Sequence, residues 1–485
     1  MSTRLLLATV LLLPLAAGPG AAPAIPNDEA SVTHALSRLT FGARPGDVER
    51  VTRMGLAAWI DSQLDPAAID DDAVQGRLAR LETLSLDAAT IARDYIRPAR
   101  QERRQALERA GREGQGGEPA MAPGSEEPGM RGERGEPGAA TPGRGRLSEA
   151  QQRGRQVLAD LTESRILRAV YSERQLEEVL VDFWFNHFNV FAGKGAVENY
   201  ITEYERDVIR PHVLGRFRDL LGATATSAAM LFYLDNWQSR AGAINENYAR
   251  ELVELHTLGV DGGYTQADVE EIARAFTGWT LRGPGGAATY RAGMHDNGSK
   301  TVLGHTLPAG GGAADADRVL DIVAAHPATA RHIATELAQR FVSDEPPAAL
   351  VDRAAATFTR TGGDLRAVVR VIVSSPEFFA DEARQAKVKT PFEFVTSAIR
   401  ATGATMMSAL PLGRTLRDLG MPLFMCVPPT GYDETAGAWL ASGALVARLN
   451  FATELAHNRL RGVRVTTDDP DALAERLGSP AFQRQ

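Results

Sequence analysis

A long segment in the first third of the chain cannot belong to a hydrophobic core, and this limits the folds that the sequence can adopt. Residues 98–146 consist mainly of Gly, Pro, Glu and Arg, with few large apolar side chains. Such a composition buries too little apolar surface to offset the entropy lost on folding. The sequence therefore predicts a disordered insertion at 98–146 and a fold built from the flanking segments, 28–97 and 147–465.

Both flanking segments carry apolar residues at helical spacing, which predicts a mostly α, multi-helix assembly. Thr265 and Asp268 have the spacing of a capping box at a helix start. The dipeptide Asn297-Gly298 is typical of a tight hairpin turn, and it predicts one small β-hairpin near 290–303. Residues 466–485 are polar, and we expect them to form a C-terminal tail that frays.

The first 24 residues have the order of a secretory signal peptide. Arg4 precedes an apolar run from Leu5 to Ala17, and small residues follow as far as Ala24. The run is too short for a stable membrane span, and no twin arginine precedes it. We therefore expect export through the general secretory route to the periplasm or the medium. After cleavage no membrane span remains, and the protein is expected to be soluble.

The net charge argues against a nucleic-acid partner, and the cysteine count excludes an intrachain disulfide. The chain has a formal net charge of −8, and loss of Arg4 with the leader makes it more negative. Nucleic-acid binding needs a basic face, so no nucleic-acid partner is expected. The single cysteine, Cys426, cannot form an intrachain disulfide, and its apolar surroundings predict a buried thiol.

The segment 247–256 provides the first candidate site. Glu251 and Glu254 lie about one turn apart on one face of the expected helix, with Arg250 beside them. Two neighbouring carboxylates repel each other unless a cation lies between them, and Arg250 or a divalent metal ion could be that cation. His256 joins such a site only if the helix end unwinds. The candidate metal ligands are Glu254, His256 and His187. The alternative is a solvated acidic stripe.

His187 provides the second candidate site. It follows Asn186 in the aromatic segment 183–188, and burying these polar side chains without partners is costly. A neighbouring helix or a ligand must therefore bind them. The alternative is a core histidine satisfied by hydrogen bonds.

His295 and Asp296 provide the third candidate site, with Lys300 close by in the sequence. They precede the expected hairpin turn, and loops often carry functional residues. The alternative is ordinary turn chemistry for Asp296 and a solvated Lys300. Because His187 needs polar partners and the acidic stripe needs cationic ones, we expect His187 to face Glu251 and Glu254, with His295 and Asp296 closing the pocket.

Five segments together resemble the bacterial DUF1800 family of exported proteins. They are 38–45 (RLTFGARP), 183–188 (FWFNHF), 245–259 (NENYARELVELHTLG), 264–266 with 275–279 (YTQ and AFTGW), and 295–296 with Lys300 and 303–304. The resemblance covers most of the chain outside the insertion. It implies export and the overall architecture, but no established activity. Members are often encoded beside another uncharacterised exported family, which is a candidate partner.

Two functions remain open from the sequence. The first is an exported enzyme, with a divalent metal as candidate cofactor, acting on a cell-envelope or extracellular substrate; its candidate catalytic residues are His187, Arg250, Glu251, Glu254, His295 and Asp296. The second is a non-catalytic envelope module for binding or scaffolding. Convergence of three or more of these side chains in one pocket favours the enzyme, and scatter into separate salt bridges favours the module.

Overall fold

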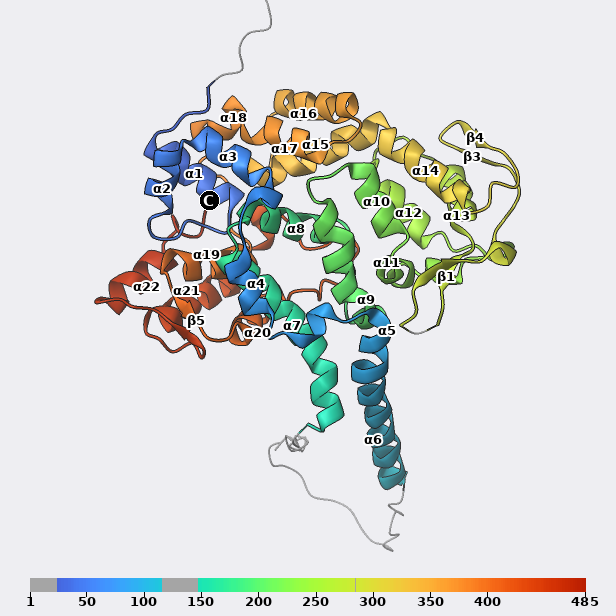
Figure 1. The fold of residues 1–485 in the computed structure, drawn as a ribbon, viewed down its shortest axis with the longest axis horizontal. Helices are drawn as coiled ribbons and strands as arrows, with labels where there is room; N and C mark the ends of the chain where they lie inside the picture. Colours follow the sequence, from blue (N-terminus) through green and yellow to red (C-terminus); the bar gives the residue numbers. More distant parts are fainter. Residues whose placement is uncertain (1–23, 116–146, 284) are drawn as a thin grey trace, which may run out of the picture.

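The computed structural model describes residues 24–115, 147–283 and 285–485, and helices dominate it (Figure 1). This confirms the predicted mostly α, multi-helix fold. The predicted signal peptide, 1–24, lies outside the described residues except for Ala24. Within the described ranges, no helix is both long enough and apolar enough to cross a membrane.

The N-terminal helices are joined to the rest of the fold through buried polar contacts. His34, on the first of them, places Nε2 2.8 Å from the carbonyl oxygen of Phe378. The helices are α1 (Glu29–Leu39), α2 (Asp47–Met54), α3 (Leu56–Gln63), α4 (Asp72–Leu78), α5 (Ala88–Thr90) and α6 (Arg97–Gln115). Between them lie the short helical segments η1 (Pro66–Ala68), η2 (Glu82–Ser85) and η3 (Ile91–Ile96).

Helix α6 corrects the predicted start of the disordered insertion. Residues 98–115 are helical and pack against the next helix, α7 (Glu149–Tyr171), as Figure 1 shows. This part of the segment is rich in Ala, Gln, Glu and Arg, which favour helix, and Arg104 pairs with Glu108 one turn later. The rest of the predicted insertion, 116–146, lies outside the described residues.

Helix α8 (Gln175–His187) lies near the centre of the molecule (Figure 1) and is buried on most of its faces, as its apolar sequence predicts. Trp184 is fully buried, and its indole Nε1 donates to the carbonyl oxygen of Val213 at 3.2 Å. The helices that follow are α9 (Val197–Glu203), α10 (Phe217–Ala225), α11 (Ala228–Tyr233), α12 (Asn247–Glu254), α13 (Gln266–Phe276) and α14 (Ala314–Ala325). Two irregular turns, η4 (Tyr204–Ile209) and η5 (Arg210–His212), follow α9.

The remaining helices form two groups, which in Figure 1 lie above α8 and to its left and lower left. One layer contains α15 (Pro327–Phe341), α16 (Ala348–Thr361), α17 (Leu365–Val373) and α18 (Pro376–Phe379). The C-terminal group contains α19 (Pro391–Ala401), α20 (Leu410–Asp418), α21 (Ser442–Ala456) and α22 (Pro470–Gly478).

The C-terminal segment 466–485 is ordered, which corrects the expected frayed tail. Helix α22 packs on α21, and Leu473 and Leu477 are buried. The backbone of Gln485 exchanges two hydrogen bonds with that of Lys387. The segment looked polar because its only two leucines, one helical turn apart, are the large apolar side chains that it buries.

Three two-stranded antiparallel sheets make up the β structure of the described residues. Their strands are β1 (Trp279–Leu281), β2 (Ala288–Tyr290), β3 (Lys300–Val302), β4 (His305–Leu307), β5 (Thr405–Met406) and β6 (Val463–Arg464). The predicted turn at Asn297-Gly298 is not a hairpin turn, because Gly298 N–H donates to Asp296 Oδ1 instead. The tight turn lies at Leu303-Gly304, where both φ angles are positive, as a type I′ turn requires.

Candidate functional site

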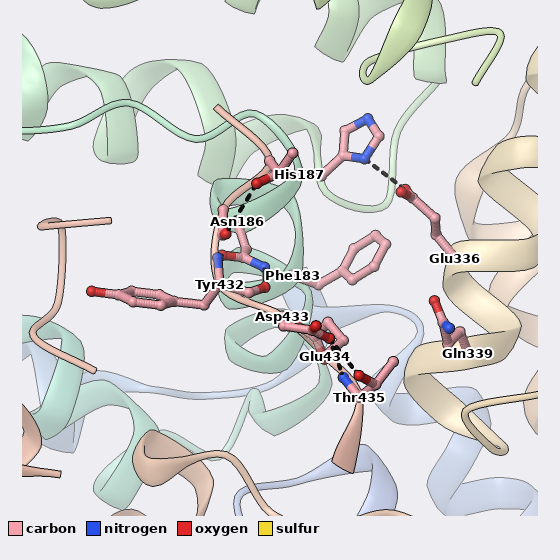
Figure 2. Close-up of a pocket in the computed structure, with 11 residues that line it drawn as sticks. Phe183, Asn186, His187, Glu336, Gln339, Tyr432, Asp433, Glu434 and Thr435 are labelled. Carbon is pink, nitrogen blue, oxygen red and sulfur yellow. Dashed lines mark hydrogen bonds and ion pairs between the residues drawn. The ribbon is translucent and has the colours of Figure 1, made fainter. Parts of the chain in front are cut away.

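A pocket of about 270 Å³ lies where α8, α15 and the loop 430–435 meet (Figure 2). Its lining consists of Phe183, Asn186, His187, Glu336, Gln339 and residues 430–435. Most of these side chains are polar, and two elements carry carboxylates on facing sides. The pocket therefore suits a small polar ligand.

The ring of His187, at the C-terminal end of α8, lies close to two oxygen atoms. Its Nδ1 lies 2.6 Å from Glu336 Oε2 (Figure 2), and its Nε2 lies 3.2 Å from the carbonyl oxygen of His256. The ring of His187 therefore lies between the Glu336 carboxylate and a backbone carbonyl, with the shorter contact to the carboxylate.

Glu336 is the member of this pair that reaches the pocket. Its side chain is 29 % exposed, whereas that of His187 is 3 % exposed. Burial raises the pKa of Glu336, but the charge and hydrogen bond of His187, together with His332, outweigh burial and lower the pKa below its usual value. His332 contributes from the same helix, with Nε2 3.4 Å from Glu336 Oε1. Glu336 is thus held in its ionised form.

His256 packs behind His187 as a neutral, buried ring. It is 1 % exposed, and its ring centroid lies 6.1 Å from that of His187. Burial lowers the pKa of His256 well below its usual value, and the neighbouring His187 and His332 lower it further. Among the described residues, its Nε2 has no hydrogen-bond partner. Its contribution to the site is the backbone carbonyl that holds His187.

The opposite wall of the pocket is fixed by Asn186. Its amide Nδ2 donates to the carbonyl oxygen of Tyr432, and Tyr432 N–H donates to Asn186 Oδ1, both at 2.7 Å (Figure 2). Gly431 allows this approach, because it has a φ of 72° and a Cβ there would lie 2.4 Å from Asn186 oxygens. The loop therefore presents Asp433 to the pocket in one defined arrangement.

The structure does not bring Glu251 and Glu254 to His187, which corrects the predicted pairing. In the described part of the chain, no hydrogen bond or ion pair joins His187 to either carboxylate. Helix α12 ends at Glu254, and the chain then turns so that His256 points into the core while Glu251 and Glu254 stay half-buried. Burial, and then the charge of Glu254, raise the pKa of Glu251. Arg250 instead contacts Glu246 and Gln266, at 3.2 and 2.8 Å.

His295 and Asp296 belong to a separate cluster that does not line the pocket. His295 Nε2 lies 3.2 Å from Asp315 Oδ2, and Lys300 Nζ lies 2.8 Å from the same oxygen. All three side chains are fully buried. Asp296 pairs with Arg274, whose hydrogen bonds lower the pKa of Asp296 to about 2. The predicted closure of the His187 pocket by His295 and Asp296 is not observed.

The predicted metal ligands do not form a set. Across the described ranges, no three or more His, Cys, Asp or Glu side chains are arranged to hold a metal ion. The rings of His187 and His256 are neighbours, but in the described residues no hydrogen bond or ion pair joins either ring to Glu254. The geometry therefore gives no support to a metal centre at Glu254, His256 and His187.

Sequence reasoning missed Glu336 and the loop 430–435. The sequence does contain a pattern that could have identified Glu336 as a candidate, because His332 and Glu336 are four residues apart and share a helix face. No local pattern links that face to His187. The loop contains Gly431 and follows Pro428 and Pro429, which predicts irregular structure but not a role as a pocket wall.

Asp182, one helical turn before Asn186, gives a test of the electrostatics beside the pocket. It lines a smaller cavity that shares Asn186 and Tyr432 with the pocket. Burial raises the pKa of Asp182 to about 6, even though Arg165 Nη1 lies 3.1 Å from Oδ1. A carboxyl whose pKa rises on folding destabilises the fold when ionised, and this cost disappears as the pH falls through about 6.

We therefore expect wild-type stability, relative to the variant Asp182→Asn, to rise by about 1–1.5 kcal/mol between pH 7.5 and pH 5. Denaturant unfolding of both proteins at the two pH values measures this difference. Burial lowers the pKa of His34 and of His256, so these two residues make the fold less stable as the pH falls. Their contribution is the same in both proteins and cancels in the comparison. A difference that is flat or falls toward pH 5 contradicts the assignment.

Comparison with known proteins gives one result. A family model described as protein of unknown function (DUF1800) matches residues 34–485. No curated protein and no solved structure matches the chain.

Proposed function

The chain belongs to the DUF1800 family of proteins of unknown function, and we propose that it is an exported enzyme whose reaction takes place in the pocket beside Glu336. The observation that carries this proposal is the 2.6 Å contact between His187 and Glu336. This contact holds an ionised carboxylate at the wall of a pocket. An ion pair that serves stability alone gains nothing from lining a pocket that solvent can enter. Export rests on the signal-peptide pattern of residues 1–24.

The proposed reaction is hydrolysis of a hydroxyl-rich substrate, such as a cell-envelope or extracellular polysaccharide. The lowered pKa of Glu336 makes it a weak base, so its role is to attack the substrate carbon or to stabilise positive charge that develops there. The second carboxyl group of such a pair protonates the leaving oxygen as the glycosidic bond breaks, and then takes a proton from the water that attacks the same carbon. We assign this second role to Asp433, on the facing wall. Its Oδ1 accepts two hydrogen bonds from Thr435, both at 2.7 Å, which fix its orientation.

The pocket lining supports a sugar-like ligand. Gln339, Thr430 and Thr435 offer hydroxyl and amide groups, and Phe183 offers one aromatic surface. Carbohydrate units need this mixture of hydrogen-bonding groups and an apolar patch. We assign the orientation of Glu336 to His187, which lines the pocket but is only 3 % exposed.

One observation favours the alternative, a non-catalytic envelope binding module. The six residues first considered catalytic lie in three separate clusters, and most are paired within their own cluster. Under the binding alternative, the same pocket holds a ligand without turnover.

Glu336→Gln tests the proposal, because it keeps the side-chain shape and removes the charge. With a panel of fluorogenic glycosides and envelope polysaccharides, we expect the variant to lose at least about 100-fold in kcat/KM on any substrate that the wild type cleaves. The matched control is Glu345→Gln, an exposed residue just beyond α15, which is expected to retain full activity.

A wild-type rate in Glu336→Gln contradicts the catalytic role. Saturable binding of an oligosaccharide by the wild type, without cleavage and with weaker binding in Glu336→Gln, supports the binding module instead.

A further inference from the structure

A second pocket, of about 440 Å³, lies between α4, α7, α9 and the segments η2 and η4. It shares no lining residue with the pocket beside Glu336. Helix α4 and segment η2 pack directly on α7, as Figure 1 shows for the two helices. Its volume falls within the range of natural small-molecule sites, about 300–1,000 Å³.

One part of this pocket is apolar. Leu78, Leu81 and Leu84 line it from the N-terminal segment, and Leu161 lines it from α7. These leucines come from different parts of the chain and together give the pocket an apolar wall. Such a wall suits a hydrocarbon chain.

A buried ion-pair network lies at the polar end of the pocket. In it, two arginines bind the carboxylates of Glu178 and Glu205. Arg210 binds both oxygens of Glu178, at 2.7 and 3.0 Å. Arg165 donates twice to Glu205 Oε2, at 2.9 and 3.1 Å. These bidentate contacts use the best acceptor positions that the network offers.

Arg168 is the arginine of this network that is left without a close anion. Its nearest carboxylate oxygen, Glu178 Oε1, lies 3.8 Å away, and its guanidinium makes no hydrogen bond to any residue that the structure describes. Its side chain is only 18 % exposed. A guanidinium has five donors, and those of Arg168 are free to bind an anion that enters the pocket.

Thr202 is a second, independent unsatisfied group in the same pocket. The residue is 1 % exposed, and its Oγ1 has no hydrogen-bond partner within the described residues. It lines the pocket together with Arg168. A buried hydroxyl and a guanidinium that both lack acceptors point to a missing anion rather than to a missing cation.

We propose that this second pocket binds an amphipathic carboxylate, with its head group on Arg168 and Thr202 and its hydrocarbon chain along the leucines. The fork of the guanidinium matches the two oxygens of a carboxylate, and the Thr202 hydroxyl donates a further hydrogen bond. Arg206 also lines the pocket, but its guanidinium is occupied by Asp207 and by the carbonyl oxygens of Leu84 and Leu86.

Calorimetric titration of the full protein with decanoate, below its micelle concentration, tests the proposal. We expect binding of one decanoate per chain, and a loss of at least tenfold in affinity for Arg168→Met. Thr202→Val is expected to weaken binding by a smaller factor. Decanol and acetate, which each lack one half of the amphiphile, are expected to bind at least tenfold more weakly than decanoate.

The control variant is Arg476→Met, an exposed arginine on α22, which is expected to bind decanoate like the wild type. Arg168→Lys keeps the charge without the fork, and an intermediate affinity is expected. Thermal unfolding of each variant confirms that it folds. Equal binding by wild type and Arg168→Met, equal affinity for decanol and decanoate, or uptake of many decanoates per chain overturns the proposal.

Discussion

Replacement of Arg340 by alanine is expected to lower the free energy of unfolding by about 3–5 kcal/mol. Arg340 lies on α15 with its side chain 3 % exposed. Its Nη1 lies 2.6 Å from Glu393 and 3.1 Å from Glu434, and Glu393 is itself 5 % exposed. Removing the guanidinium leaves a buried carboxylate without its main compensating charge. Denaturant unfolding of Arg340→Ala and wild type, monitored by circular dichroism, measures the difference.

Arg331→Ala is the matched control for this variant. Arg331 lies on the same helix and pairs with Asp352, but both side chains are about 60 % exposed. Exposed pairs of this kind contribute at most about 1 kcal/mol. Equal losses of unfolding free energy in Arg340→Ala and Arg331→Ala would contradict the prediction. They would mean that burial of the Arg340 ion pairs adds no stability.

Arg340 also explains why the pocket has a defined shape. It joins α15, which carries Glu336, to Glu434 in the opposite wall and to Glu393 on α19. The same loop is held by Lys387, whose Nζ donates to the carbonyl oxygen of Glu434 at 2.7 Å. The two carboxylates that we assign to the reaction, Glu336 and Asp433, are therefore carried by walls that are tied together.

The features that the sequence predicts well depend on a few neighbouring residues. The capping box at Thr265 and Asp268 forms as expected, because its hydrogen bonds join residues three positions apart. Cys426 is buried, and burial raises its pKa to about 11. The need of Asn186 and His187 for polar partners was also visible, since it follows from their aromatic surroundings alone.

The identity of those partners could not be predicted in the same way. Asn186 is satisfied by the backbone of Tyr432, and His187 by Glu336, both far along the chain. Glu251 and Glu254, which the sequence suggested as partners of His187, make no hydrogen bond or ion pair with it in the described residues. Which helix faces which depends on the packing of the whole core, and no spacing rule within one segment contains that information.

The predicted position of the hairpin turn was also wrong. Asn297-Gly298 has the composition of a hairpin turn, but Asp296 captures the Gly298 N–H with its own side chain. Leu303-Gly304 forms the tight turn although leucine rarely adopts a positive φ, here 48°. Lys300, in the strand before it, is fully buried against Asp315, and this buried ion pair fixes the register of the hairpin.

Asp315→Ala is expected to cost about 3–5 kcal/mol of the free energy of unfolding, because it leaves the Lys300 ammonium buried without its carboxylate. Lys300 Nζ keeps only backbone acceptors, such as the carbonyl oxygen of Gly298 at 3.0 Å. His295 loses the same partner, since its Nε2 lies 3.2 Å from Asp315 Oδ2. Thermal and denaturant unfolding of the full chain measure the loss.

The double variant Lys300→Met/Asp315→Leu separates loss of the charge pair from loss of packing. If the uncompensated ammonium causes the loss, the double variant will regain most of the stability, because apolar side chains of similar size can replace a buried ion pair at little cost. Asp317→Ala is the control on the same helix, since Asp317 is 67 % exposed and pairs with Arg218 at the surface. A double variant less stable than Asp315→Ala, or an Asp317→Ala loss as large as that of Asp315→Ala, would show that the buried charges are not what holds this part of the fold.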